Sequence, residues 1–366
     1  MSDDIKENLN LADLTWEAAG QNGVKVEGIV LLNDENEKED NFSDFIKEIP
    51  QIPTLDYSKG STVNDCLRKY NLSHNQGWDS IYGSTALRFG SAFHAGMDGF
   101  YGYIAEHGWT RDGKALEQMI FFAEKDWKEE SKEKTFFIDY RTFENLIILL
   151  SRYVDHFYND EGFVKIFHTE RAFKLLMKPT KEDKRNFPWL KPFYFTGKLD
   201  QECELNGARW INEFKTTGWS INQLKNQLQR SPQIIGYNYA SRKCFDIKPE
   251  GNLVTIAYCT SRKSKATENY GKLTTDFARV PMVFSDDDLA LWRSHFIAIA
   301  ARVQQATERN YFPPNISSCY NYGRCKYLNI CEQPCSPEKA SFNGYEKKPL
   351  WDVTKTVKGN VIEGEE

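Results

Sequence analysis

The stretch "GKLDQECELNGARWINEFKTT", residues 197–217, contains two strand-like runs separated by Asn206-Gly207. Asn-Gly is the strongest short hairpin signal, because a type I′ turn requires positive φ at both central residues. If these two residues form the loop, Asp200 lies directly opposite Glu213 in the hairpin. The stretch therefore predicts an antiparallel pair that carries two facing carboxylates.

Like charges directly opposite on a sheet repel, so these carboxylates, with Lys215 one pleat away, predict a hard cation between them. Mg²⁺ takes oxygen ligands, commonly one or two carboxylates with water and phosphate. A bound cation would lower the pKa of a water, and Lys215 could position that water or stabilise charge on a phosphate. The alternative is a solvated strand face with an incidental Glu-Lys pair. Alternation assigns Asp200, Glu202, Glu213 and Lys215 to one face and Leu199, Trp210 and Phe214 to the other, with Lys198 opposite Lys215.

Three other short motifs carry polar residues that could join this site. In "GSAFHAG", residues 90–96, small residues would let a helix pack closely on the sheet and direct His94 at the metal; a core or surface histidine is the alternative. Glu170 in "HTERAF" lies on a strand expected beside the hairpin and could supply another ligand or be a surface glutamate. In "SPQIIGYNYA" a helix that begins at Ser-Pro puts Gln233 and Tyr237 on one face. Both can hydrogen-bond a phosphate or a base, although a buried helix face also accounts for them.

The ordered set "GSAFH", "GKLD", "EFK" and "QIIGY" over residues 90–237 resembles the signature of PD-(D/E)XK nucleases of the RecB type. The resemblance implies a restriction-endonuclease-like α/β core, a mixed central sheet flanked by helices, that hydrolyses DNA with Mg²⁺ or Mn²⁺. By this resemblance the metal-binding residues are His94, Asp200, Glu213 and, more loosely, Glu170. The catalytic residues are His94, Asp200, Glu213 and the catalytic lysine Lys215. The residues that contact DNA are Gln233 and Tyr237.

Four cysteines crowd into residues 319–335, and Cys66 lies near the start of the predicted folded region. Four thiolates can hold an iron–sulfur cluster or a structural zinc, but paired CxxC knuckles are absent, which favours the cluster over zinc. The iron–sulfur members of the family, which include bacterial recombination nucleases and CRISPR-associated exonucleases, imply a [4Fe–4S] cluster that joins the two ends of the nuclease domain. Ordinary free thiols are the alternative. The implied ligands are Cys66, Cys319, Cys325 and Cys331, with Cys335 as a possible substitute because the first gap is five residues long.

The remaining periodicity predicts the order of the elements. Residues 61–73 and 90–108 fit helices that begin near Ser61 or Thr62 and near Gly90, and residues 113–160 fit a helical section. Strands follow, and Ser285 caps a last helix. The order indicates an α/β domain with a helical insertion, and the resemblance implies an Fe–S-stapled C-terminal knot. The predicted segments are an acidic flexible N-terminus over residues 1–49, the nuclease domain over 50–342 and a flexible tail over 343–366. We expect Cys203, Cys244 and Cys259 to be small buried hydrophobes.

Charge is unevenly distributed along the chain. Residues 1–50 hold 13 acidic and 4 basic side chains, a charge of −9, so residues 51–366 carry +4 of the total of −5. A mildly basic body can hold a polyanion, and a solvated mixed-charge surface is the alternative. The acidic segment predicts a solubilising tail or a contact for a protein partner. The sequence has no apolar run that approaches the roughly 20 residues of a membrane span, and no secretory signal. We therefore expect no membrane partner and a cytoplasmic, intracellular location.

The residues and the resemblance together predict a metal-dependent DNA nuclease, favouring exonuclease action on single-stranded or end-containing DNA. The resemblance alone implies a role in recombination, repair or phage and mobile-element DNA processing. Tyr237, Tyr239 and Trp219 could stack unpaired bases near the site. The alternative is a catalytically weak DNA-binding or recombination accessory protein with the same fold, and a zinc-stabilised scaffold is a third reading. A Walker-type GxxxxGK[ST] motif is absent from the sequence, so we expect no fused ATP-driven helicase.

Overall fold

The computed structural model describes residues 52–110, 112–137, 139–157, 163–245, 248–261, 272–321, 323–333, 340–350, 352–353 and 361–365. The chain divides into two units, residues 1–51 and residues 52–366, and only the second is described below. The predicted acidic segment over residues 1–49 lies outside the described residues. Of the helices described, none has the length and apolar character needed to cross a bilayer.

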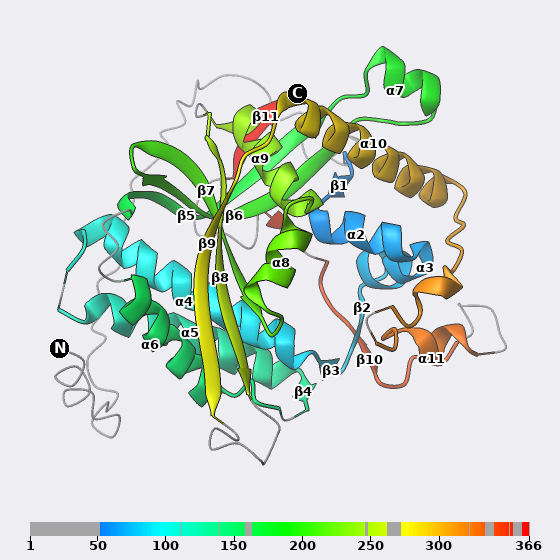
Figure 1. Cartoon of the computed structure of the whole chain (residues 1–366). Helices are drawn as coiled ribbons and strands as arrows, with labels where there is room; N and C mark the ends of the chain where they lie inside the picture. Colours follow the sequence, from blue (N-terminus) through cyan, green and yellow to red (C-terminus); the bar gives the residue numbers. More distant parts are fainter. Residues whose placement is uncertain are drawn as a thin grey trace, which may run out of the picture. The chain divides into compact units, whose positions relative to one another are not determined.

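A mixed sheet forms the centre of the second unit, and its described strands run in the order β11-β5-β6-β7-β8-β9, with β1 beside β6 (Figure 1). The strands are β1 (Thr54–Leu55), β5 (Phe163–Met177), β6 (Phe193–Leu205), β7 (Ala208–Thr217), β8 (Gly251–Ser261), β9 (Leu273–Met282) and β11 (Ile362–Glu365). Strands β5, β6 and β7 are antiparallel neighbours, whereas β7 and β8 are parallel. A parallel pair needs a crossover connection, and α8 (Ile221–Leu228) and α9 (Pro232–Cys244) supply it.

Helices cover both faces of this sheet (Figure 1). Helices α4 (Thr85–His107), α5 (Lys114–Glu133) and α6 (Phe143–Phe157) share one buried cluster with β7 and β8, which we call the α4-side core. Helices α2 (Tyr57–Asp65), α9 and α10 (Asp286–Glu308) share another with β5, β6 and β7, the α9-side core. On β7, Ile211 belongs to the α9-side core and Phe214 to the α4-side core, as alternation along a strand requires.

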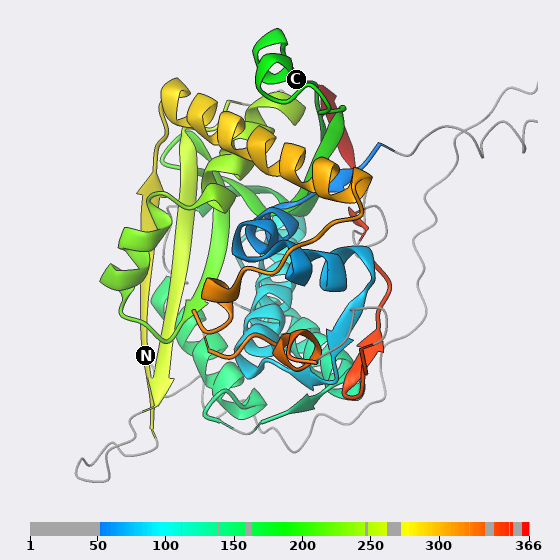
Figure 2. The same cartoon turned by 90° about the vertical axis from the view of Figure 1, so that its right-hand side faces the viewer.

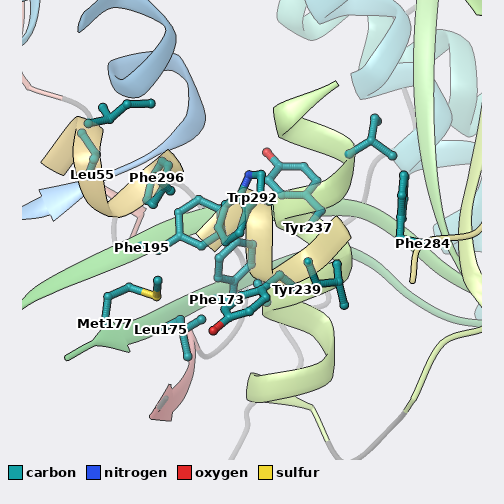
Figure 3. Packing of buried hydrophobic residues seen from close by; sticks show 14 of the residues in the cluster. Leu55, Phe173, Leu175, Met177, Phe195, Tyr237, Tyr239, Phe284, Trp292 and Phe296 are labelled. Carbon is teal, nitrogen blue, oxygen red and sulfur yellow. The ribbon is translucent and has the colours of Figure 1, made fainter. Parts of the chain in front are cut away.

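Aromatic rings fill the α9-side core. Figure 3 shows Phe195 from β6 beside Trp292 and Phe296 from α10, with Tyr237 nearby. The Phe195–Phe296 and Trp292–Phe296 ring centroids lie 4.8 Å and 5.1 Å apart. A Cβ at Gly236 would lie 2.6 Å from the Trp292 ring, so this glycine lets α9 and α10 approach closely. The close approach positions α9, and the polar residues on it, against the sheet.

The C-terminal segment returns to the N-terminal part of the unit. Strand β10 (Tyr345–Lys347) pairs with β2 (Trp78–Ser80), and β11 pairs with β5, although we expected residues 343–366 to be a flexible tail. Smaller elements complete the described chain: α3 (Leu67–Tyr70), the π-helix η1 (Asn71–Asn75), β3 (Tyr82–Gly83), β4 (Thr135–Phe136), α7 (Lys181–Asn186), the 3₁₀ helix η2 (Ile316–Ser318) and α11 (Leu328–Cys331).

Two predicted helix starts are wrong, and one is confirmed. Helix α2 begins at Tyr57 behind the N-cap Asp56, and α4 begins at Thr85 behind the N-cap Ser84, both earlier than predicted. Several residues near each start can cap, and the tertiary contacts of the first turn select among them. Ser285 caps α10 as predicted, in a reciprocal capping box with Asp288.

Candidate active site

The β6–β7 hairpin has the predicted register at its turn end. The two loop residues have φ of 54° and 79°, and Cα pairing runs back to Gln201 and Asn212. The ladder stops there, so the predicted pairing of Asp200 directly opposite Glu213 does not form. Instead, Asp200 Oδ2 accepts a hydrogen bond from the Phe214 backbone N–H at 2.8 Å. The acid on β6 therefore reaches across to β7 at the point where the two strands separate.

Strand β6 changes face at Asp200. Leu199 lies in the α9-side core and Cys203 in the α4-side core, although strict alternation would put both on one face. The neighbouring strand β5 has an irregularity at the same level, where Glu170 has φ of 52°. Local irregularities of this kind redirect side chains. The predicted face assignment is therefore wrong for Leu199, which lies on the opposite side of the sheet from Phe214.

The predicted pairing of Lys198 with Lys215 is also wrong. Lys198 lies opposite Ala172 on β5 and forms an ion pair with Glu170. Lys198 does not pair with Lys215 because the β6–β7 ladder ends before these two residues. Lys198 pairs only with the other neighbouring strand, β5. The structure therefore places Glu170 with Lys198, and the contacts described for it include neither Asp200 nor Glu213.

His94 on α4 meets Asp200 from the α4 side of the sheet. Its Nδ1 lies 3.2 Å from Asp200 Oδ2, and its ring packs edge-on against Phe214. One turn earlier, a Cβ at Gly90 would lie 3.4 Å from Thr216 Oγ1 on β7. The small residue in "GSAFH" thus accompanies close packing of α4 on the sheet, as the sequence predicts.

Glu213, Lys215 and Gln233 form a connected group on the α9 side. Lys215 Nζ donates to Glu213 Oε1 at 2.6 Å and to Gln233 Oε1 at 3.0 Å. Gln233 Nε2 donates to the same Glu213 Oε1 at 2.9 Å and lies 3.5 Å from Tyr237 Oη. Helix α9 begins at Pro232, and Gln233 and Tyr237, four residues apart, share one of its faces as predicted.

The three charged groups perturb one another. Burial, reinforced by the charge of Asp200, raises the pKa of Glu213 to about 7 despite the nearby Lys215. Burial also disfavours the charged form of Asp200, but His94, Lys215 and the Phe214 N–H more than offset it and lower the pKa of Asp200. Burial alone would lower the pKa of Lys215, and the two carboxylates raise it instead. Asp200 is therefore the ionised acid, and Glu213 is the acid that binds a proton most readily.

The donor set fits a hard divalent cation. Glu213 Oε2 has no hydrogen-bond partner among the described residues, and this side chain is only 2% exposed. A buried carboxylate oxygen without a partner is costly, and Asp200 and His94 are the neighbours that could share a cation with it. Two carboxylates with water and phosphate suit Mg²⁺ or Mn²⁺. Within the described residues, no three His, Cys, Asp or Glu side chains already converge as ligands of one ion.

Sequence reasoning missed two features that support this group. Gly197 lies under α9, where a Cβ would be 2.7 Å from the Phe173 ring and 3.0 Å from the Tyr237 ring. Asn212 Nδ2 donates to Gln201 Oε1 at 2.8 Å, and Thr255 Oγ1 on β8 donates to Asn212 Oδ1 at 2.7 Å, all fully buried. This buried amide row joins β6, β7 and β8 beside the acids. An asparagine in the middle of a strand was the available signal, because strands disfavour it.

The three aromatic residues predicted to stack on bases have different positions. Tyr239 is 7% exposed, and its ring centroid lies 5.0 Å from that of Trp292, so the stacking role predicted for it is wrong. Tyr237 is 9% exposed and packs edge-on against Phe173, so the stacking role predicted for its ring is wrong as well. Trp219, just beyond β7, is 49% exposed.

Four cysteines line one cavity of about 660 Å³ together with basic side chains. They are the predicted cluster ligands Cys66, Cys319, Cys325 and Cys331. Cys335 lies outside the described residues. Cys203 and Cys259 are buried as predicted, whereas Cys244 is half-buried. Burial raises the pKa of these three thiols to about 12, 11 and 12 respectively, which keeps them protonated and inert.

Comparison with known proteins gives a family match that covers most of the chain. The family model described as the PD-(D/E)XK nuclease superfamily matches residues 54–332. No curated protein matches. A solved structure described as the crystal structure of SSO0001 is 10% identical, with 79% of this chain and 91% of that chain covered, at a TM-score of 0.29, which is too low to support a statement about fold or function. The family match spans His94, the hairpin and α9, and the chain belongs to the PD-(D/E)XK nuclease superfamily.

Proposed function

We propose that this protein is a Mg²⁺- or Mn²⁺-dependent deoxyribonuclease that acts on single-stranded or end-containing DNA. The observation that carries the proposal is the buried Glu213: among the described residues, one of its oxygens beside Asp200 has no partner, and the other is held by Lys215. Burying two acids and a lysine together is costly unless the group has a charged ligand to bind. Membership of a nuclease superfamily supports the reaction class.

Each residue of the group has a distinct role in this proposal. Asp200 and Glu213 hold the cation, and His94, in contact with Asp200, completes or tunes the site. A divalent cation held there supplies a water of lowered pKa and neutralises phosphate charge. Lys215 Nζ, oriented by Glu213 and Gln233, donates a hydrogen bond to the attacking water or to the phosphate oxygen on which charge develops. Glu170 is a weaker candidate ligand, because Lys198 neutralises it.

DNA reaches this group from the α9 side in our proposal. Gln233 and Tyr237 offer an amide and a hydroxyl to a phosphate or base next to Lys215. The exposed Trp219, at the end of β7, offers a ring on which an unpaired base can stack. We retain two predictions made from the sequence and the resemblance. One is exonuclease action in intracellular recombination, repair or mobile-element DNA processing, and the other is a protein partner for the acidic N-terminal segment.

We also propose a [4Fe–4S] cluster held by Cys66, Cys319, Cys325 and Cys331, with Cys335 as the alternative ligand. The cavity that these four thiols line, about 660 Å³, has room for a four-iron cubane, and Arg68 and Lys69 beside it can offset the negative charge of the thiolates. The cavity is remote in sequence from the hairpin, which suits a structural role for the cluster.

The test is cleavage of end-labelled linear and circular single-stranded DNA by anaerobically purified protein in Mg²⁺, Mn²⁺ or EDTA. Lys215→Ala is the decisive variant, and Lys181→Ala on the exposed helix α7 is the matched control. We expect metal-dependent cleavage by the wild type and the control, and a loss of about 10²-fold or more in Lys215→Ala. Cleavage of the circle would indicate endonuclease action.

Equal cleavage by the wild type and Lys215→Ala would refute the assignment of the site. A folded wild type that binds single-stranded DNA but does not cleave it in either metal would support the alternative, a DNA-binding accessory protein.

A further inference from the structure

Large hydrophobic side chains are exposed where β3, β4 and the first turn of α4 meet. Tyr82 on β3 is 54% exposed, Phe137 just after β4 is 73% exposed, and Leu87 on α4 is 75% exposed. The Tyr82 and Phe137 rings lie nearly parallel, with their centroids 6.0 Å apart. We call these three side chains the apolar patch. Adjoining exposed apolar groups mark a binding surface, whereas apolar side chains scattered singly over a surface do not.

The backbone beneath the patch holds its two rings in fixed positions. Strands β3 and β4 lie side by side as a parallel pair (Figure 1), in which Gly83 is opposite Phe136. A Cβ at Gly83 would clash with the Phe136 ring, and the Arg88 guanidinium lies 4.5 Å from the centre of the same ring. Phe136 is therefore packed, and the next residue, Phe137, points outward, as alternation along a strand predicts. Thr85 Oγ1 also donates to the Phe137 carbonyl oxygen at 3.0 Å. Rings held in this way lose little freedom when a flat ligand stacks on them.

The patch is continuous with the candidate active site along α4. Leu87 and His94 are seven residues apart, close to two helical turns, so they share a face of α4 and lie about 10 Å apart along its axis. Ser91, between them, is exposed. Thr216 on β7, the residue after Lys215, lies beside the same stretch of α4. The exposed face of α4 thus leads from the patch to the group that holds the cation in our proposal.

The end of β7 also reaches the loop that follows Phe137. A Cβ at Gly218 would lie 3.0 Å from the Tyr140 hydroxyl oxygen, so the two segments pack closely. The exposed Trp219 comes directly after this glycine. The ring already proposed to stack on a base and the two rings of the patch therefore belong to adjoining segments of the surface.

Basic side chains lie on the other side of Leu87. This leucine also lines the cavity that contains the four cysteines. Figure 2 shows the C-terminal part of that lining, in orange, beside the blue helices α2 and α3. The charged residues of the lining are the bases Arg68, Lys69, Arg324 and Lys326 and the acids Asp65 and Glu332. An excess of positive charge beside exposed rings is typical of proteins that bind single-stranded nucleic acid, because cations attract the phosphates and rings stack on the bases.

We propose that the apolar patch is a further site for unpaired bases, which stack on it while the phosphate to be cleaved lies at the cation site. The inference rests on the proposed deoxyribonuclease and adds the surface that the strand follows on the α4 side, whereas Gln233 and Tyr237 serve the α9 side. Every base has a face that can stack on Tyr82 or Phe137, so the patch binds bases without reading their sequence. The bases of a duplex are already stacked on one another, so the patch selects single strands.

The test is binding of fluorescently labelled oligothymidylates to the full-length protein in EDTA, where cleavage does not interfere. Lengths of about 4 and about 16 nucleotides cover the range of site sizes known for single-strand-binding folds. A duplex of the longer length is measured alongside. The variants are Tyr82→Ala, Phe137→Ala and Phe137→Tyr, which keeps the ring. Phe121→Ala is the matched control, because Phe121 is an exposed phenylalanine on α5 whose ring contacts Phe122.

We expect Tyr82→Ala and Phe137→Ala each to weaken binding of the longer oligothymidylate about tenfold, which is within the range for one stacked base. Phe137→Tyr and Phe121→Ala should bind it as the wild type does. Stacking involves no phosphate, so the factor lost should be the same at every salt concentration. Binding of the duplex should be unchanged in all the variants.

Two results would overturn the patch as a site for unpaired bases in a wild type that binds and cleaves single-stranded DNA. One is a loss in the alanine variants no larger than that in Phe121→Ala, which would favour a protein partner for the patch. The other is an equal loss for the duplex. A wild type that neither binds nor cleaves single-stranded DNA, with Mg²⁺ or without it, would instead overturn the proposed deoxyribonuclease, and the role of the patch with it.

Discussion

Replacing Glu213 with glutamine should remove a pH-dependent loss of stability that the active site imposes on the metal-free protein. Burial, together with the charge of Asp200, raises the pKa of Glu213 from 4.5 to about 7. Between these two pH values the folded protein holds a proton that the unfolded chain has released. The unfolding free energy therefore falls as the pH rises through this window, and the fall is complete above pH 7.

The size of the effect follows from the shift in pKa. A shift from 4.5 to about 7 corresponds to about 3 kcal/mol, at about 1.4 kcal/mol for each pKa unit. In the Glu213→Gln variant this contribution is absent, because glutamine does not titrate. The wild type should therefore lose about 3 kcal/mol more unfolding free energy than the variant between pH 4.5 and pH 8. Mg²⁺ at pH 8 should recover stability in the wild type and not in the variant, since a ligand stabilises only the state that binds it.

The measurement is urea unfolding at several pH values, in EDTA and in Mg²⁺, for the wild type, Glu213→Gln and the control Glu204→Gln. Glu204 is a half-buried glutamate on the same hairpin, so its variant should follow the wild-type curve. Parallel pH curves for the wild type and Glu213→Gln would refute the reasoning, because they would mean that burial does not hold the Glu213 carboxyl in its protonated form near neutral pH.

Four further outcomes test the site and its surroundings. Asn212→Ala should lower the unfolding free energy by about 2–4 kcal/mol in urea, because it leaves the Gln201 amide and the Thr255 hydroxyl buried without partners; a change below 1 kcal/mol would contradict this. Gly197→Ala should cost about 1–3 kcal/mol and reduce cleavage, since its Cβ would press on the rings that support α9. Gly102→Ala, whose Cβ would have its nearest neighbour at 3.9 Å within a helix, should be neutral or stabilising by the same measurement. Removing divalent cations with EDTA should abolish cleavage without unfolding the domain, as measured by circular dichroism.

The hairpin shows how much of the site the local sequence can predict. Asn206-Gly207 determined the turn, and with it the pairing of the strands as far as Gln201 and Asn212, because the turn needs positive φ and few other pairs allow it. The end of the ladder after Gln201 could not be predicted in the same way. It depends on the neighbouring strands β5 and β8 and on the helices that pack on both faces of the sheet. The residues of the hairpin do not determine where these elements lie.

The order of the motifs predicted the contents of the site, but not its connections. The structure brings together the residues His94, Asp200, Glu213, Lys215 and Gln233. Each lies on a helix or strand of the kind that the sequence predicts for its motif. Glu170 was predicted from its strand and, more loosely, from the family resemblance. In the structure it forms an ion pair with Lys198, at a position where its backbone φ is 52°. Tyr239 was predicted to be accessible and is buried, because α10 covers that face of α9.

The sequence by itself determined the turn, the identities of the acids and lysine, and the cysteines available to a cluster, because these depend on residue type and short spacing. Only the tertiary structure decided which groups meet. It turned Asp200 toward the Phe214 N–H, left one oxygen of Glu213 with no partner in the part of the chain that the structure describes, and brought Asn315 to Cys66 across about 250 residues. Such contacts arise where the layers of the fold pack together. Burial determines the free-energy cost of an unpaired charge there, and residues distant in sequence contribute most of that burial.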